Sequence, residues 1–341
     1  MPFCAGMGAD RQFYSFDAQA GRAALLLLSR DPDPSVTRRL AGALACLEPE
    51  LALLDADLVL MAPFGAAAAL FRPGAVSDGV SVVVSHDGLF DSCAVPADAP
   101  MIVVIDRATR VMAAWTTDEA GCLPTGRLAL EAVRRLSREA AAACALPAPV
   151  LPVPGLLEEA LCRALIDRFE ASAHFDSGVT GSSLDGQTQH RLNHDRKRRR
   201  DWMLQPGDGL HEAVLERLLR RCAPEIRRAF QKEVTHADRI LVARYDAGGG
   251  YFRRHRDNSA PGVAFRQFAL SVNLNAGAYE GGQLLFPEYN DHLFRPQTGE
   301  GIVFSASLLH EATPVTAGSR YVLLTFLHDR EAEDRRLAQL D

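Results

Sequence analysis

Residues 244–258 read RYDAGGGYFRRHRDN, and residues 301–327 read GIVFSASLLHEATPVTAGSRYVLLTFL. Both stretches contain short apolar runs separated by glycine, proline and polar residues, a pattern typical of β-strands joined by turns. If the first stretch includes a strand, His255 and Asp257 project from the same face, as side chains two residues apart in a strand do. His310 lies 53 residues after Asp257, where an apolar run gives way to a turn. These stretches therefore predict a β-rich region that brings two histidines and one carboxylate together.

Two histidines and one carboxylate on the same side of a metal ion form the facial triad of non-haem Fe(II) oxygenases, which leaves coordination positions open. The spacing predicts His255, Asp257 and His310 as the ligands. Arg320 follows His310 by ten residues and opens the apolar run 321–327. An arginine that reaches into an apolar barrel needs a carboxylate partner, and its planar fork suits the distal carboxylate of 2-oxoglutarate.

Two other sites in the sequence offer alternative metal ligands. His236 and Asp238 have the same His-x-Asp spacing, but they fall between a predicted helix and the first predicted barrel strand, where a turn is expected. His292 is an alternative distal ligand, but no arginine follows it at the right interval, so an exposed loop histidine is favoured. An isolated His-x-Asp pair can also be a surface strand pair. The ordered set of His-x-Asp, histidine and arginine is what favours the pair in 244–258.

From about Ala237 to Asp329 the chain resembles the 2-oxoglutarate/Fe(II) dioxygenases of the prolyl 4-hydroxylase type, with weaker similarity back to Leu156. The two stretches quoted above carry the resemblance, together with SVNLN and EGGQLLFPEY. The resemblance implies an α+β domain with a double-stranded β-helix (jelly roll) core. It implies Fe(2+) bound by the three ligands named above, 2-oxoglutarate as cosubstrate with its C5 carboxylate on Arg320, and L-ascorbate as a helper.

The sequence departs from the animal collagen hydroxylases of that family at two positions. Those enzymes carry lysine where this chain has Arg320, and tyrosine where it has Phe252, which follows Tyr251. Because three glycines at 248–250 leave the register open, Tyr245 is predicted to supply the hydroxyl that joins Arg320 on the carboxylate. The alternative is that Tyr245 is a half-buried aromatic residue that supports the strand.

The sequence divides at residues 146–155, LPAPVLPVPG, where four prolines in ten residues predict a linker. In residues 1–145 short apolar runs alternate with helical patterns, which predicts an α/β domain. Residues 156–235 show helical apolar spacing and form the lead-in to the second domain. Residues 236–330 contain many short strands and turns, which predict an antiparallel sandwich or barrel.

Residues from about 10 to 140 resemble the thioredoxin-like fold of peroxiredoxins in the order of their strands and helices. In that family a reactive cysteine lies at the start of the helix after the first core strand, where the helix dipole lowers its pKa. The corresponding stretch, DPDPSVTRRL at residues 31–40, contains no cysteine. Cys46 falls further along the same predicted helix and is expected in the core. The resemblance therefore implies a domain without redox activity.

Composition limits the partners and the location of the protein. The 341 residues are enough for two domains, and a formal net charge of −6 disfavours nucleic acid as a partner and gives no attraction for an anionic membrane. Seven dispersed cysteines without a Cys-x-x-Cys pair, and an N-terminus without a secretion signal, predict reduced thiols and a cytoplasmic location. The basic run Arg196–Arg200 is predicted as a solvated face, with a substrate loop or nucleic-acid contact as alternatives.

The sequence therefore predicts an Fe(II)- and 2-oxoglutarate-dependent dioxygenase. The expected reaction uses O2 to hydroxylate a C–H bond in a peptide or protein residue, or in a small molecule, and releases succinate and CO2. Two other functions stay open: a thiol peroxidase-like protein with an ancillary barrel, and a sensor that binds iron or 2-oxoglutarate without turnover.

Overall fold

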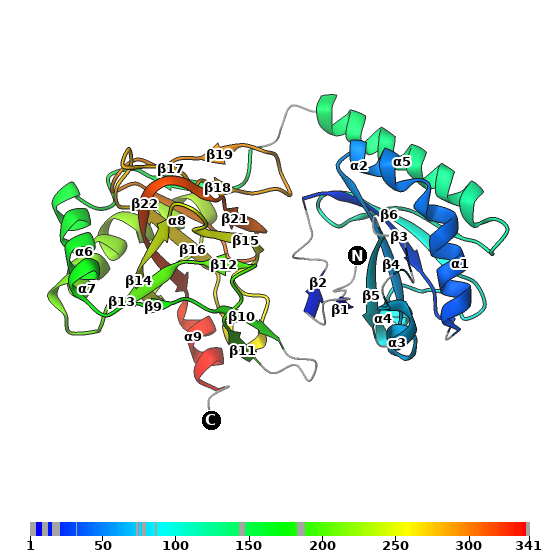
Figure 1. The fold of residues 1–341 in the computed structure, drawn as a ribbon. Helices are drawn as coiled ribbons and strands as arrows, with labels where there is room; N and C mark the ends of the chain where they lie inside the picture. The colour runs from blue at the N-terminus through cyan, green and yellow to red at the C-terminus, as the bar shows by residue number, and fades with distance from the viewer. Residues whose placement is uncertain are drawn as a thin grey trace. The chain divides into compact units, whose positions relative to one another are not determined.

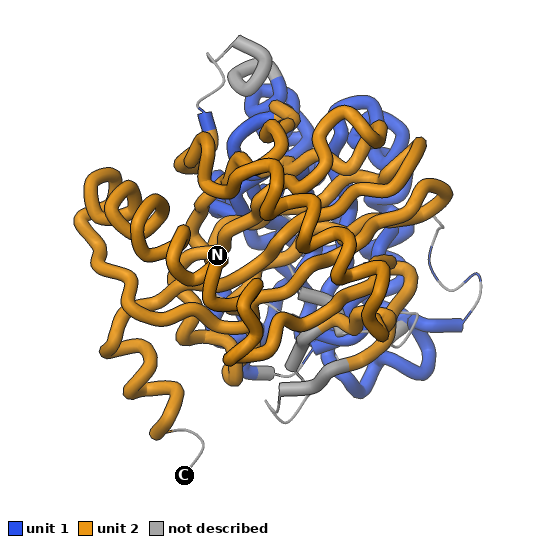
Figure 2. Tube along the Cα trace, turned by 90° about the vertical axis from the view of Figure 1, so that its left-hand side faces the viewer, with its two compact units in different colours: residues 1–147, 287–290 blue, residues 148–286, 291–341 orange. Residues whose placement is uncertain are grey.

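The structure is a computed structural model that describes residues 5–8, 13–15, 21–31, 33–72, 74, 76, 80–85, 87–142, 147–182 and 188–338. The chain divides into two compact units, residues 1–147 with 287–290 and residues 148–286 with 291–341 (Figure 2). Each unit has its own sheets and its own buried hydrophobic clusters. Within the described ranges, no helix has the length and apolar character needed to cross a membrane.

Unit 1 is built on one seven-stranded sheet with the order β2-β1-β5-β4-β3-β6-β7 (Figure 1). The central strands β3, β4 and β5 are parallel, and β6 and β7 extend the sheet in antiparallel pairing. The bounds are β1 (Ala5–Gly8), β2 (Phe13–Ser15), β3 (Ala23–Leu28), β4 (Ala56–Pro63), β5 (Val80–Ser85), β6 (Met101–Ile105) and β7 (Val111–Thr116). The strands β3 and β6 have the bounds that their apolar runs predict.

The central strands of unit 1 are continuously apolar because both faces of the sheet are covered. Leu25 and Leu27 pack on one side with α1 (Pro34–Ala45) and α5 (Cys122–Ala142). Leu26 and Leu28 pack on the other side with α4 (Asp87–Ser92). The shorter helices are α2 (Glu48–Leu53) and α3 (Ala67–Leu70), which follows the 3-10 turn Phe64–Ala66. This layered α/β arrangement is the one that the alternation of runs predicts.

The position of Cys46 differs from the expectation. Cys46 is the residue after the last helical position of α1 and is exposed, so its predicted place in the core is wrong. The buried positions around it belong to Leu44 and Leu47, because the amphipathic spacing turns residue 46 away from the sheet. The first turn of α1 follows the N-cap Asp33, and its residues are Pro34, Ser35 and Val36.

Unit 2 contains two antiparallel sheets and a separate hairpin. The larger sheet has the order β8-β20-β16-β22-β14-β13-β9, with β17 also paired to β22, and the smaller has the order β12-β15-β21-β18-β19. The strands of the larger sheet are β8 (Leu151–Val153), β9 (Phe175–Asp176), β13 (Arg200–Met203), β14 (His236–Asp246), β16 (Phe268–Asn273), β17 (Tyr279–Gly281), β20 (Gly301–Ser305) and β22 (Val315–His328). The others are β12 (Lys197–Arg198), β15 (Tyr251–His255), β18 (Leu284–Leu285), β19 (Leu293–Phe294) and β21 (His310–Ala312), with β10 (Val179–Ser182) and β11 (Thr188–Arg191) forming the hairpin.

The larger sheet is buried on both faces. One face, with Val242 of β14 and Leu270 of β16, packs against α6 (Glu159–Ala171), α7 (Gly209–Arg217) and α8 (Ala223–Phe230). The other face, with Leu241 and Ala243, packs against Ala312 of the smaller sheet. Successive residues of β14 thus serve different cores, as the two-residue period of a strand requires. The C-terminal helix of unit 2 is α9 (Arg330–Leu337).

Two boundaries of unit 2 differ from the sequence expectation. Residues 151–153, expected in the linker, form the edge strand β8, which pairs with β20. Proline is compatible with an edge strand because its missing N–H can face away from the neighbouring strand. The helical pattern over 209–232 is divided by a π-helical turn at Leu218–Cys222, after which Pro224 lies in the first turn of α8.

We predict that unit 1 has no thiol peroxidase activity, because the first turn of α1 offers no cysteine and Cys46 lies at the opposite end of that helix. The full-length protein should consume hydrogen peroxide no faster than its Cys46→Ser variant. Stoichiometric formation of sulfenic acid at Cys46 under low peroxide would contradict this prediction.

Candidate active site

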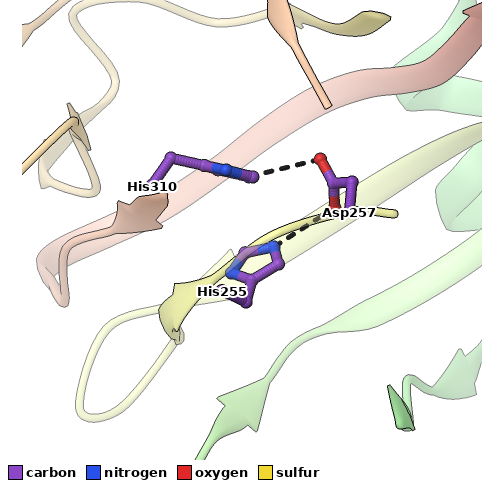
Figure 3. A group of neighbouring side chains, drawn as sticks. All are labelled: His255, Asp257 and His310. Atoms are coloured by element: carbon purple, nitrogen blue, oxygen red, sulfur yellow. Dashed lines mark ion pairs between the residues drawn. The ribbon is translucent and has the colours of Figure 1, made fainter. Parts of the chain in front are cut away.

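Three potential metal ligands converge between two neighbouring strands of the smaller sheet (Figure 3). His255 is the last residue of β15 and pairs in register with His310, the first residue of β21. Asp257 follows β15, and its backbone N–H donates to the carbonyl of Ala306 at 2.9 Å. His255 Nε2 lies 3.3 Å from Asp257 Oδ1, and His310 Nε2 lies 3.4 Å from Asp257 Oδ2. One atom from each of the three side chains lies within 4.8 Å of the other two.

The backbone fixes which nitrogen of each imidazole is free. His255 Nδ1 lies 2.8 Å from the carbonyl oxygen of Arg253, and His310 Nδ1 lies 3.0 Å from that of Leu308. A carbonyl oxygen only accepts, so each Nδ1 carries the proton and donates it. In the neutral form of each ring the lone pair then lies on Nε2, the atom that faces Asp257, and this is the tautomer that a metal-binding histidine needs.

The protonation states at neutral pH suit a cation. Burial, together with the neighbouring His310, lowers the pKa of His255 to about 4, so the His255 imidazole is neutral. Burial alone would raise the pKa of Asp257. The neighbouring His310 and His255 outweigh burial and hold the pKa of Asp257 well below its usual value. The Asp257 carboxylate is thus ionised and the His255 imidazole is neutral, which are the states in which these two groups bind divalent metals.

Aromatic side chains enclose the histidines. The ring of Phe252 stacks on His255 with centroids 3.4 Å apart, and Phe304 packs edge-on against His310 at 4.6 Å. Phe286, which is almost fully buried, packs against Phe304 at 5.0 Å. This apolar surround limits access of water and fixes the orientation of both imidazoles.

The two alternative sets of ligands lie outside this cluster. His236 and Asp238 belong to strand β14, so the predicted turn is wrong there, because β14 begins earlier than its apolar run. Asp238 forms an ion pair with Arg266 at 2.7 Å, and His236 stacks on a neighbouring imidazole. His292 is exposed, and its ring packs edge-on against Phe294. Among the residues that the structure describes, one group of three or more potential metal ligands occurs, the cluster of His255.

Arg320 is a buried charge without an acidic partner. It lies in β22, only 2% of it is exposed, and it forms no ion pair with the described residues. Its Nε atom is buried and has no hydrogen-bond partner. Gly282, with φ of +65°, packs so closely that an added Cβ would lie 2.8 Å from Arg320 Cδ. A buried cation without a partner is unfavourable by several kcal/mol, so the chemistry of this position fits an anionic ligand.

Tyr245 lies beside Arg320. The two residues pair across β14 and β22, and the Arg320 guanidinium carbon lies 5.5 Å from the centre of the Tyr245 ring. Tyr245 is almost fully buried, and its hydroxyl accepts a hydrogen bond from Arg199 Nη1 at 3.0 Å. The structure thus brings the two residues predicted to bind the cosubstrate together on the same pair of strands.

The basic run Arg196–Arg200 contains two residues whose burial the sequence does not predict. A solvated face is wrong for Lys197, which is 6% exposed, and for Arg199, whose side chain is 9% exposed. Residues 197–198 and 200–203 are strands, so the side chains alternate between the interior and solvent. The Lys197 amine lies 4.7 Å from the Phe252 ring, the same ring that stacks on His255, and it donates to Gly178 O at 2.8 Å. The two-residue period of a strand could have predicted which of these side chains are buried, but five consecutive basic residues conceal that period in the sequence.

Comparison with known proteins yields matches for the second unit. Residues 240–328 match the 2OG-Fe(II) oxygenase superfamily. A PKHD-type hydroxylase from Methylobacterium nodulans is 31% identical over 201 residues, which cover 55% of this chain and 82% of the relative. A PKHD-type hydroxylase from Nitrobacter winogradskyi is 34% identical over 112 residues, and the chain spans half of the length of that relative.

Two solved structures are similar to parts of the chain. A prolyl-4-hydroxylase from Pseudomonas putida is 20% identical with a TM-score of 0.41, covering 57% of this chain and 96% of that one. Peroxiredoxin Q from Xanthomonas campestris is 12% identical with a TM-score of 0.34, covering 39% of this chain and 92% of that one.

We predict that His310→Ala abolishes tight Fe(II) binding, because the remaining histidine and carboxylate leave a labile divalent ion with two protein ligands. His292→Ala is the matched control, since it removes an exposed histidine outside the cluster. Anaerobic calorimetry with Fe(II) should show binding by the parent and by His292→Ala. If His310→Ala binds iron as tightly as the parent, the assignment of His310 as the distal ligand is wrong.

Proposed function

Because the chain belongs to the 2OG-Fe(II) oxygenase superfamily, we propose that it is an Fe(II)- and 2-oxoglutarate-dependent dioxygenase that hydroxylates a C–H bond. The superfamily match and the PKHD-type relatives confirm the resemblance seen in the sequence of the second unit. The observation that carries the proposal is the joint presence of the His255–Asp257–His310 cluster and the unpaired Arg320 in one unit.

In this proposal His255, Asp257 and His310 hold Fe(II) through two Nε2 atoms and one carboxylate oxygen. The set fits the ion because both imidazoles direct Nε2 toward the carboxylate, and the carboxylate is ionised. Three protein ligands leave positions for a chelating cosubstrate and O2. When bound, Fe(II) with 2-oxoglutarate and O2 supplies the oxidation that hydroxylates the substrate and releases succinate and CO2.

Arg320 and Tyr245 would hold the cosubstrate. The Arg320 guanidinium offers a planar fork of donors that matches a carboxylate, and its burial strengthens that pairing. Tyr245, with its ring beside the same guanidinium, would add a hydroxyl donor to the C5 carboxylate. These two residues bind and orient the cosubstrate, while Phe252 and Phe304 exclude water from the histidines.

We also propose the finer features of the fold. The two antiparallel sheets of unit 2 would be the double-stranded β-helix, with residues 236–330 as its core. Residues 156–235 would be its helical lead-in, which also adds the strands β9, β12 and β13 to the two sheets. Residues 1–145 would be a thioredoxin-like domain without peroxidase activity. Free cysteines, five among the described residues, support a cytoplasmic location, and ascorbate would keep the iron reduced.

For the substrate we propose a residue in a peptide or protein. A free metabolite needs only a closed pocket, which one barrel can supply. This chain adds a second folded unit with its own sheet and core, which a metabolite pocket in the barrel does not require. A small molecule is the alternative.

The proposal is tested by measuring succinate from 2-oxoglutarate with Fe(II), ascorbate and O2 in the presence of proline-containing peptides and free amino acids. We expect succinate that depends on both iron and O2 and increases with a peptide substrate. Peroxide consumption in place of succinate would favour the thiol peroxidase function. Binding of 2-oxoglutarate without any succinate would favour a sensor.

We predict that Arg320→Ala weakens 2-oxoglutarate binding by about 2–5 kcal/mol, or about tenfold for each 1.4 kcal/mol, because the distal carboxylate loses its buried partner. Arg320→Lys should fall between the parent and Arg320→Ala, since lysine keeps the charge but not the fork. Fe(II) affinity, measured in the same variants, should change far less. An unchanged Michaelis constant for 2-oxoglutarate in Arg320→Ala would remove this residue from the site.

A further inference from the structure

We propose that Arg199 is a positioning residue for the cosubstrate. It holds the Tyr245 hydroxyl as a hydrogen-bond acceptor, so that the single proton of this hydroxyl is directed to the carboxylate bound by Arg320. The inference rests on the proposed function, because it assumes that 2-oxoglutarate occupies the position beside Arg320. It adds a residue that neither contacts the metal nor belongs to the predicted site.

The hydrogen-bonding partner of the Tyr245 hydroxyl determines whether its oxygen donates or accepts. Arg199 Nη1 lies 3.0 Å from the Tyr245 oxygen. A guanidinium has donors and no acceptor, so the phenol oxygen must accept here. The phenol proton then points elsewhere, and within the described part of the chain we find no acceptor for it. A buried hydroxyl whose proton has no partner is unfavourable, so this one is arranged for a ligand.

Arg199 is itself held rigidly. Its Nε lies 2.8 Å from Asp201 Oδ1, and its Nη2 donates to Asp201 Oδ2 at 3.0 Å. Asp201 is fully buried and also accepts a hydrogen bond from Ser177 Oγ. The guanidinium carbon lies 5.8 Å from the Tyr245 ring and 5.7 Å from the Phe252 ring, which limits its rotation. The third arm of the guanidinium is thereby fixed toward Tyr245.

Strand pairing connects this network to Arg320. Strand β13, which carries Asp201, pairs with β14, which carries Tyr245, and β14 pairs with β22, which carries Arg320. The Arg199 charge is balanced by Asp201, whereas Arg320 has no acidic partner among the described residues. An anion at this place therefore pairs with Arg320 and receives the Tyr245 proton. Arg199 contributes by setting the direction of that proton.

A role in bracing the strands is the competing explanation, and a double-mutant cycle separates the two. If Arg199 acts through Tyr245, its loss matters only while the Tyr245 hydroxyl is present. If Arg199 supports the strands alone, its loss acts equally in either background and also disturbs the metal cluster. Arg200→Met is the matched control, because Arg200 is the adjacent arginine and is exposed.

The experiment measures 2-oxoglutarate affinity by calorimetry on the full-length protein loaded with Mn(II), which avoids turnover. The variants are Arg199→Met, Tyr245→Phe, the double variant and Arg200→Met. We expect each single variant at Arg199 or Tyr245 to weaken 2-oxoglutarate by about tenfold, since one charge-assisted hydrogen bond is weakened. The double variant should bind no more weakly than Tyr245→Phe, and Mn(II) affinity should be unchanged throughout.

Independent losses that multiply in the double variant, or an equal loss of Mn(II) affinity in Arg199→Met, would overturn the inference. If Arg199→Met does not fold because Asp201 is left unpaired, Asp201→Asn provides the second variant. It loosens Arg199 and should weaken 2-oxoglutarate only in the presence of Tyr245; an equal loss in the Tyr245→Phe background overturns the inference. A parent protein that binds Mn(II) but no 2-oxoglutarate would instead refute the proposed function itself.

Discussion

The buried charge of Arg320 is the constraint on which the account of this site depends. A guanidinium that is 2% exposed requires a counter-charge, and the described residues supply none. Gly282 leaves room for the Arg320 side chain, because a side chain at position 282 would collide with it. Because β14 and β22 pair directly, the same guanidinium lies against the Tyr245 ring. In the proposed function, the distal carboxylate of 2-oxoglutarate supplies this counter-charge and accepts the proton of the neighbouring hydroxyl.

The metal cluster depends on a second constraint, which is the pairing of two short strands. The register between β15 and β21 places His255 opposite His310. Asp257, two positions after His255, directs its carboxylate toward both imidazoles. Backbone carbonyls then fix the tautomer of each imidazole. The geometry therefore needs little reorganisation to accept a cation, since the donor atoms of the three side chains already face one another.

Much of the second unit follows from the sequence because its signals are local. The strand β20 has the bounds that its apolar run predicts, and the spacing of His255, Asp257 and His310 anticipates a cluster that the fold assembles. Signals that depend on tertiary contacts are harder to read. The burial of Arg199 depends on Asp201 and Tyr245 in the folded unit, and the run of five basic residues conceals the alternation that separates it from its exposed neighbours. The edge strand β8 likewise depends on a partner about 150 residues away in sequence.

The most direct test of the account is an anaerobic titration of the protein with 2-oxoglutarate, in the presence and absence of Fe(II). In the proposed site the iron and Arg320 bind the two ends of one 2-oxoglutarate molecule, so both contribute to its affinity. We predict one molecule of 2-oxoglutarate bound per chain, with a much higher affinity when Fe(II) is present. Equal affinity with and without iron, or no binding with iron present, would contradict the account.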